Sequence, residues 1–319
     1  MKAVTQVFEQ VSDPSCDTSS KRVSTDWAFD RYEQVRARLP SATFPSNVVS
    51  ADNLLALAKH FDGFILDAFG VLNVGETAIP GAIERIAELR ALGKQLIVLT
   101  NGATQTLSQA VAKYKNLGFD FTTTEVVASR EVAATRLDQI SPDALWGAIA
   151  GPGDDFSDLA VNAIDLIEQP DAYQRVDAFL FLSSARWHHQ HQDRLLAALA
   201  SRTRPVVVAN PDLVAPREDG LSLEPGYYAH AIADQVHAPI IFHGKPFADA
   251  LADAIARMPG LKAPRIAMVG DTLHTDILGG KAAGLGTILV SDHGLFAGAD
   301  LNPYVERSGI VPDYIVPTT

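Results

Sequence analysis

The chain has 319 residues, 47% of them hydrophobic and 20% charged, and a formal net charge of −12. This length suits one large or two medium domains, and the composition is that of an ordinary globular protein. The negative charge argues against binding to nucleic acid or to an anionic membrane surface. A single cysteine, Cys16, excludes an intramolecular disulfide and suits a reducing cytoplasm. No apolar run reaches the roughly 18 residues of a transmembrane helix.

The first 49 residues are predicted to form an N-terminal extension. Residues 1–25 are polar and are expected to be loosely ordered. Over 26–38 the apolar residues recur at near-helical spacing, starting with Trp27, Phe29 and Tyr32. This pattern predicts an amphipathic helix that braces the core or forms a homodimer contact.

Strands and helices alternate over residues 50–140. The predicted elements are a capped helix at 51–60, strands at 63–67, 95–99 and 125–129, and helices at 82–92 and 107–117. Alternation of this kind predicts a parallel sheet with helices on both faces, an α/β fold similar to the Rossmann arrangement.

A second, smaller α/β unit is predicted over 141–222, and the core is expected to resume over 223–319. The smaller unit is predicted to contain strands at 144–150, 178–182 and 206–209 and a helix at 193–200. The resumed core is predicted to contain strands at 239–243, 266–270 and 287–290, a helix at 247–258, and a final edge strand at 313–316. The predicted core is therefore interrupted by an inserted domain.

Two predicted core strands end in carboxylates. Asp67 closes the apolar run Gly63–Leu66, and Asp271 ends the strand at 266–270, with Asp276 in the next loop. Open α/β sheets carry their chemistry at the carboxyl edge. Mg²⁺ takes oxygen ligands and usually one or two protein carboxylates. These residues therefore predict a Mg²⁺ site.

Groups suited to phosphate oxygens lie at other strand ends. Thr100, Asn101 and Gly102 offer a hydroxyl, an amide and turn N–H groups. Lys245, in Gly-Lys-Pro, supplies a positive charge. Asn210 and Asp212 follow a strand of the inserted domain and should return toward the same edge, where substrate contact and a hinge role are equally consistent with their position.

These segments, in this order, resemble the four motifs of the haloacid dehalogenase superfamily. The resemblance implies that Asp67 is the nucleophile, that Thr100 and Asn101 form the second motif, and that Lys245 forms the third. Asp271 and Asp276 match the acidic fourth motif, and the Phe69 main-chain carbonyl is implied as a further Mg²⁺ ligand. The resemblance spans about residues 60–295.

The spacing of the motifs locates the inserted domain. Only 33 residues separate Asp67 from Thr100, whereas 145 separate Thr100 from Lys245. An insertion between the second and third motifs is similar to the class II cap, and Asn210-Pro211-Asp212 is similar to class IIA. That group contains sugar-, nucleotide-, nitrophenyl- and pyridoxal-phosphate phosphatases, so the implied partner is a small phosphorylated metabolite.

One position departs from the family pattern. The first motif reads Asp-x-Asp, but Phe69 occupies the third position, where the family places its general acid and base. Such assistance is worth about 10²–10⁴-fold. A slow phosphatase that recruits another acid, such as His243 or His274, is one reading. Two others are a protein that binds a phosphorylated ligand without turnover and, from the similarity to Asp-Ala-Tyr-Gly, a metal-free 2-haloacid dehalogenase.

Overall fold

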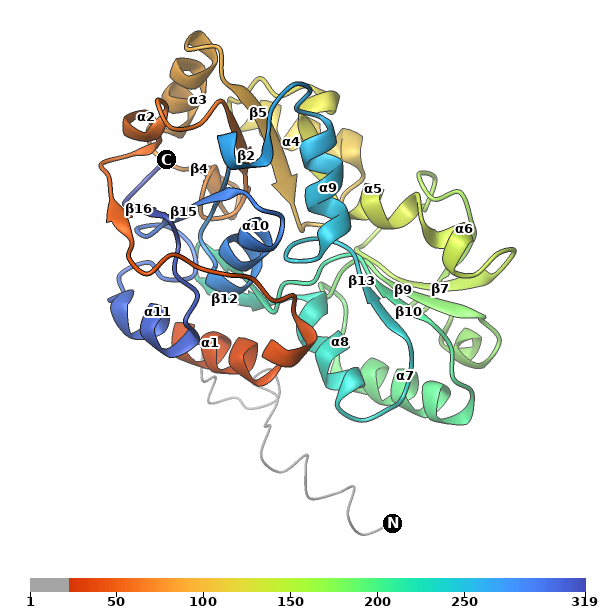
Figure 1. Cartoon of the computed structure of the whole chain (residues 1–319). Coiled ribbons are helices and arrows are strands. Elements are labelled where there is room, and N and C mark those ends of the chain that lie inside the picture. Colours follow the sequence, from red (N-terminus) through yellow and green to blue (C-terminus); the bar gives the residue numbers. More distant parts are fainter. Residues whose placement is uncertain (1–22) are drawn as a thin grey trace.

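The computed structural model describes residues 23–319. The extension predicted as loosely ordered therefore lies largely outside the described residues. The chain forms a large and a small parallel sheet with helices around both (Figure 1). No helix in the described part is long and apolar enough to cross a membrane.

The large sheet has seven strands, all paired in parallel, in the order β1-β16-β15-β14-β2-β5-β6. Their bounds are β1 Val49–Ser50, β2 Gly63–Leu66, β5 Gln95–Thr100, β6 Val126–Ala128, β14 Ile266–Gly270, β15 Gly286–Val290 and β16 Tyr314–Val316. The predicted strand at 313–316 is present, but its predicted place at the edge is wrong. The two-residue strand β1 pairs outside it and forms the edge.

Alternating side chains of β2 and β5 pack on opposite faces of this sheet. Phe64 and Leu66 join the cluster formed with one set of helices, whereas Ile65 and Ile97 join the cluster on the other face. The helices on the first face are α2 Leu54–Leu57, α3 Ala82–Ala91 and α4 Leu107–Asn116; those on the second are α5 Ser129–Ala134 and α9 Ala248–Ala256. The predicted helix at 51–60 is thus shortened to one turn, beginning after its cap Asn53.

The small sheet has five parallel strands in the order β13-β10-β9-β7-β8. They are β7 Leu145–Ile149, β8 Asn162–Asp165, β9 Ala178–Phe181, β10 Val206–Val208 and β13 Ile240–Phe242. One face packs on α7 His189–Ser201 and α8 Pro225–Ala233, and the other packs on α5 and α6 Leu137–Ile140. The helix α5 therefore lies between the two sheets.

The expected return to the core at residue 223 does not match the strand pairing. Strand β13 pairs with β10, and Ala229 and Ile232 of α8 pack in the apolar cluster of the small sheet. The physical reason is that this segment is apolar and buries its side chains against the small sheet. Without it, strand β10 would have no partner on that side. The division into a core and a cap domain stays a prediction.

Further elements are the helices α1 Thr25–Gln34, α10 Leu278–Ala282 and α11 Asn302–Ser308, the π-helix η6 Leu273–Ile277 that runs into α10, the hairpin β11 Val214–Arg217 with β12 Gly220–Leu223, and the hairpin β3 Asn73–Val74 with β4 Thr77–Ala78. The predicted helix over 26–38 is present as α1 followed by a 3₁₀ turn at Arg36–Arg38. In Figure 1, α1 lies beside α11.

Candidate active site

Asp67 and Lys245 meet at the carboxyl edge of the large sheet. Asp67 follows β2, and its Oδ1 accepts the Ala68 N–H at 2.7 Å and contacts Lys245 Nζ at 2.5 Å. Lys245 Nζ also lies 2.8 Å from Asp276 Oδ1. The lysine is 1% exposed, so its charge is held between two carboxylates and shielded from solvent.

Three carboxylates gather at this position. One carboxylate oxygen from each of Asp67, Asp271 and Asp276 lies within 4.8 Å of the others. The Asp271 oxygens accept the Thr272 hydroxyl at 3.0 Å and the Leu295 N–H at 2.6 Å, and Asp276 Oδ2 accepts the Thr272 N–H at 3.1 Å. The donors fix the carboxylates, and the group offers only oxygen ligands.

The cluster holds more negative than positive charge. Burial raises the pKa of the Asp67 carboxyl to about 7, with Lys245 opposing the rise and Asp276 adding to it. Burial, Asp276 and Asp67 raise the pKa of Asp271. The Lys245 pKa is raised although its burial acts to lower it, because Asp276, Asp67 and Asp212 surround the ammonium. A divalent cation among these carboxylates would offset that excess, so the residues fit Mg²⁺.

Glycines permit this close packing at two points. Gly70 has φ of +77°, and a Cβ there would lie 2.7 Å from Asp271. Gly244 has φ of +121°, and a Cβ there would lie 2.6 Å from Asn101 Oδ1. Any other residue would strain the backbone and displace the polar side chain beside it.

The predicted phosphate loop follows β5. Asn101 ties it to two other segments: its Nδ2 donates to Asp212 Oδ1 at 2.8 Å and to the Lys245 carbonyl at 2.9 Å, and its Oδ1 accepts the Lys245 N–H at 2.7 Å. Gly102 N–H donates to Thr100 Oγ1 at 3.1 Å. The structure thus brings Thr100, Asn101 and Gly102 to the same edge as Asp67.

Asn210 and Asp212 occupy different positions. Asp212 lines the cavity beside Asp67, whereas Asn210 bonds Glu224 Oε2 at 3.1 Å and the Asp212 N–H at 3.0 Å. Burial raises the pKa of Asp212, with Lys245 opposing and Asp67 adding. The contacts of Asn210 are those of a residue that holds the turn.

The Phe69 ring lies between two cations. Lys113 Nζ and Arg217 Cζ each lie 4.9 Å from its centroid, and the ring borders the cavity with Asp67. Arg217 belongs to the β11–β12 hairpin, which covers the cavity with Val214, Ala215 and Pro216. In this conformation the cavity measures about 20 Å³, room for one water-sized group.

The two histidines considered as replacement acids do not lie among the cavity-lining residues. His243 Nδ1 bonds Asp249 Oδ2, and His274 Nε2 lies 2.5 Å from Glu33 Oε1. Both rings are buried. Lys245 and Asp276 are also absent from the lining and reach the site through the contact of Lys245 with Asp67.

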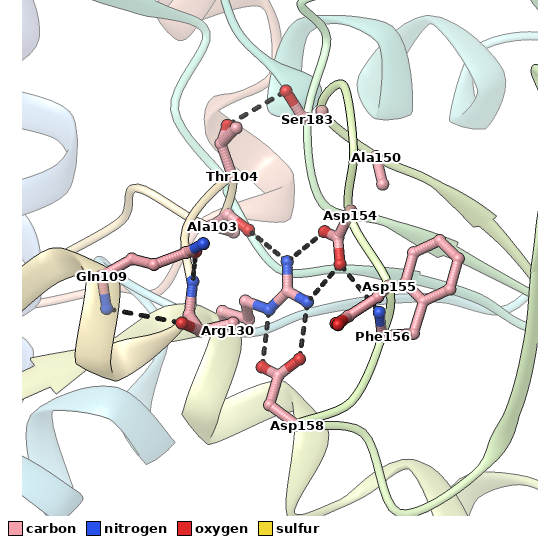
Figure 2. Close-up of polar contacts among 12 residues, drawn as sticks. Ala103, Thr104, Gln109, Arg130, Ala150, Asp154, Asp155, Phe156, Asp158 and Ser183 are labelled. Carbon is pink, nitrogen blue, oxygen red and sulfur yellow. Dashed lines mark hydrogen bonds and ion pairs between the residues drawn. The ribbon is translucent and has the colours of Figure 1, made fainter.

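Sequence reasoning missed one buried cation beside the phosphate loop. Arg130, on α5, is 1% exposed and forms paired contacts with Asp154 and Asp158, the shortest at 2.5 and 2.6 Å (Figure 2). Its neighbour Ser129 donates to the Asn101 carbonyl at 2.9 Å. The loop after β7 is thereby tied to the helix that supports the loop after β5.

The fold and this edge together define an open α/β protein in which three carboxylates, a buried lysine and polar loop groups gather at the carboxyl edge of the large sheet. Two family models match the chain: one for haloacid dehalogenase-like hydrolases over residues 64–159 and one described as HAD-hydrolase-like over 242–318. Together they cover more than half of the chain. The chain belongs to the haloacid dehalogenase-like superfamily.

Named proteins resemble the chain over most of its length. Human glycerol-3-phosphate phosphatase is 29% identical, covering 84% of this chain and 92% of that protein. The acid sugar phosphatase of Staphylococcus aureus is 26% identical, covering 80% and 94%. The glycerol phosphate phosphatase of Mycobacterium tuberculosis, solved in complex with magnesium, has a TM-score of 0.62 and 25% identity, covering 81% of this chain and 75% of that one.

Proposed function

We propose that this protein is a Mg²⁺-dependent phosphatase of small phosphate monoesters, with a class IIA cap formed around the small sheet. The observation that carries the proposal is the buried group of Asp67, Asp271 and Asp276 around Lys245. It is supported by the similarity to phosphatases acting on glycerol phosphate and sugar phosphates. Glycerol phosphate and sugar phosphates are accordingly the first substrates to test.

Asp67 is assigned as the nucleophile. Its Oδ1 is engaged by Ala68 and Lys245, so Oδ2 is the oxygen that we assign to attack on phosphorus. The attack forms an aspartyl-phosphate and releases the alcohol, and water then hydrolyses the intermediate. Lys245, the Thr100 hydroxyl and the N–H groups of the 100–102 loop would orient the phosphoryl oxygens.

Asp67, Asp271 and the Phe69 carbonyl would hold Mg²⁺, and Asp276 would hold Lys245. When bound, Mg²⁺ neutralises the phosphoryl oxygens and draws the phosphate against the nucleophile. Phe69 supplies no proton to the leaving alkoxide, and its ring excludes water from that side of the cavity. Turnover is therefore slow for substrates whose leaving group needs protonation.

The test is a panel of phosphate esters that includes p-nitrophenyl phosphate, measured with and without Mg²⁺, beside an Asp67→Asn variant. Hydrolysis that requires both Mg²⁺ and Asp67 supports the proposal. Tight binding of an ester without turnover would instead favour the reading as a phospho-ligand-binding protein. Metal-independent activity would contradict the assigned roles of the three carboxylates.

A further inference from the structure

The helix α1 precedes both segments that match the family models, the first of which starts at residue 64. It nevertheless contacts the segments that carry the site residues. It lies beside α11 and near the carboxyl edge of the large sheet (Figure 1). Three contacts, made by buried or partly buried side chains, lead to the segments that hold Asp276, Asp212 and Asp271. A fourth, more exposed contact reaches the end of α8.

The first contact is with the π-helix η6, Leu273–Ile277, which follows Asp271 and carries Asp276. Glu33 Oε1 lies 2.5 Å from His274 Nε2, and the His274 ring is fully buried. The Tyr32 ring stacks on that imidazole with centroids 4.9 Å apart and an interplanar angle of 7°. Because His274 lies between the two aspartates in the chain, fixing its ring fixes the π-helix that carries Asp276 and follows Asp271.

The second contact is with the turn that carries Asp212. The Leu213 N–H donates to the Tyr32 hydroxyl at 3.1 Å, in a fully buried position. Removing that hydroxyl would leave a buried N–H without its acceptor, which is unfavourable, so the turn would have to shift to find another. Tyr32 therefore joins the Asp212 turn and the His274 segment through one side chain.

The third contact reaches Asp271 through the loop at 293–296. Thr25 Oγ1 donates to the Leu295 carbonyl at 2.8 Å, and the N–H of the same Leu295 donates to Asp271 Oδ2 at 2.6 Å. The fourth contact is with the end of α8, where Arg31 and Arg38 both pair with Asp234, at 2.7 and 2.5 Å. Arg31 is on α1 and Arg38 is on the 3₁₀ turn that follows it, so this segment also links the large sheet to the unit around the small sheet.

We propose that α1 is a support of the active site, in which Glu33 positions the Asp271–Asp276 segment through His274 and Tyr32 positions Asp212 through Leu213. Neither side chain lines the cavity, so both are positioning residues. This inference rests on the proposed function, because that function assigns Asp271 to cation binding and the 100–102 loop to phosphate, and Asp212 lines the same cavity and accepts the Asn101 amide. A helix that served only to brace the fold would affect stability without affecting either affinity.

The experiment compares Glu33→Leu, Glu33→Gln and Tyr32→Phe with Asp30→Leu in the full chain. Asp30 is the matched control, because it lies on the same helix as Glu33 and Tyr32 but on an exposed side. There it pairs with Arg307 of α11 at 2.6 Å. For each variant we would measure the melting temperature, the Kd for Mg²⁺ and for inorganic phosphate by calorimetry, and kcat and KM for p-nitrophenyl phosphate.

Glu33→Leu should raise the Kd for Mg²⁺ about tenfold, the lower end of the effect of outer-shell partners of metal ligands. Glu33→Gln keeps an acceptor for His274 and should restore most of that affinity. Tyr32→Phe should raise KM and the Kd for phosphate while leaving the Kd for Mg²⁺ nearly unchanged. Asp30→Leu should leave all three values unchanged.

Unaltered affinities in Glu33→Leu and Tyr32→Phe, with or without a lower melting temperature, would overturn the inference. A wild-type protein that binds phosphate but no Mg²⁺ contradicts the proposed metal site and the role of Glu33, and Tyr32→Phe then decides the role of Tyr32. A wild-type protein that binds neither ion contradicts both proposals at once.

Discussion

Replacing Phe69 with aspartate should restore the missing proton transfer. The ring of Phe69 borders the cavity with Asp67, and Lys113 and Arg217 lie 4.9 Å from its centroid. Losing two such contacts costs about 0.5–1 kcal/mol each at partly exposed positions. The new carboxylate can pair with the same two cations for about 0–1 kcal/mol each. The variant should therefore stay folded.

The expected gain in rate is at the lower end of what an acid and base contribute. General acid–base catalysis is worth about 10²–10⁴-fold. The two cations lower the pKa of a carboxyl at position 69 and make it a weaker donor at neutral pH. We therefore expect a gain of up to about 10²-fold in kcat/KM for alkyl phosphates such as glycerol phosphate.

The assay measures kcat/KM and kcat on glycerol phosphate and on p-nitrophenyl phosphate. The aryl oxide leaves without protonation, so Phe69→Asp should change its kcat/KM little but raise its kcat by accelerating hydrolysis of the aspartyl-phosphate. Phe69→Asn is the control, because asparagine has nearly the same shape as aspartate but cannot act as a general acid or base. An equal gain in Phe69→Asn would refute the reasoning. No gain, with normal folding and Mg²⁺ affinity, would favour a binding protein.

Four further outcomes are expected. In the wild type, kcat/KM for aryl phosphates should far exceed that for alkyl phosphates; equal values would show that another residue supplies the proton. The folded protein holds protons on Asp67 and Asp271 that the unfolded chain has lost, so the stability of the metal-free protein falls as pH rises from about 4 to about 7. The rise in melting temperature caused by Mg²⁺ should therefore be larger at about pH 7.5 than at about pH 5. An equal rise at the two pH values would argue against cation binding at these carboxylates. Arg130→Gln should destabilise the protein by about 3–5 kcal/mol, because it leaves the Asp154 carboxylate, 6% exposed, without its cation. Arg136→Gln, which loses a more exposed pair with Asp253, should cost about 0–1 kcal/mol. Similar losses in the two variants would contradict the assigned burial effect. Incubation with 2-chloropropionate should release no chloride, and measurable release would revive the dehalogenase reading.

The sequence predicted the large sheet well, because its strands are apolar runs that end in Asp67, Thr100 and Asp271, each followed by a turn. Parallel strands bring such ends together, so the clustering of these residues follows from the order of the strands. The predicted place of β16 failed because a two-residue strand such as β1 carries no periodic signal.

Other parts of the site depend on contacts between distant segments. Glu33 and His274 are 241 residues apart, and Arg130 and Asp154 belong to different predicted domains. No local pattern pairs them. The packing of α8 and β13 on the small sheet could not be read from the sequence, because these segments have the same apolar periodicity whichever sheet they pack on.

Trapping the aspartyl-phosphate tests the central claim most directly. Wild-type protein with Mg²⁺ would be mixed rapidly with excess p-nitrophenyl phosphate, quenched in acid, and analysed by peptide mass spectrometry. Because Phe69 cannot activate the attacking water, the intermediate should accumulate. We expect a burst of nitrophenolate equal to the enzyme concentration and a phosphorylated peptide containing Asp67, both absent in Asp67→Asn. Steady turnover with no phosphate on Asp67, or a comparable rate in Asp67→Asn, would contradict this account.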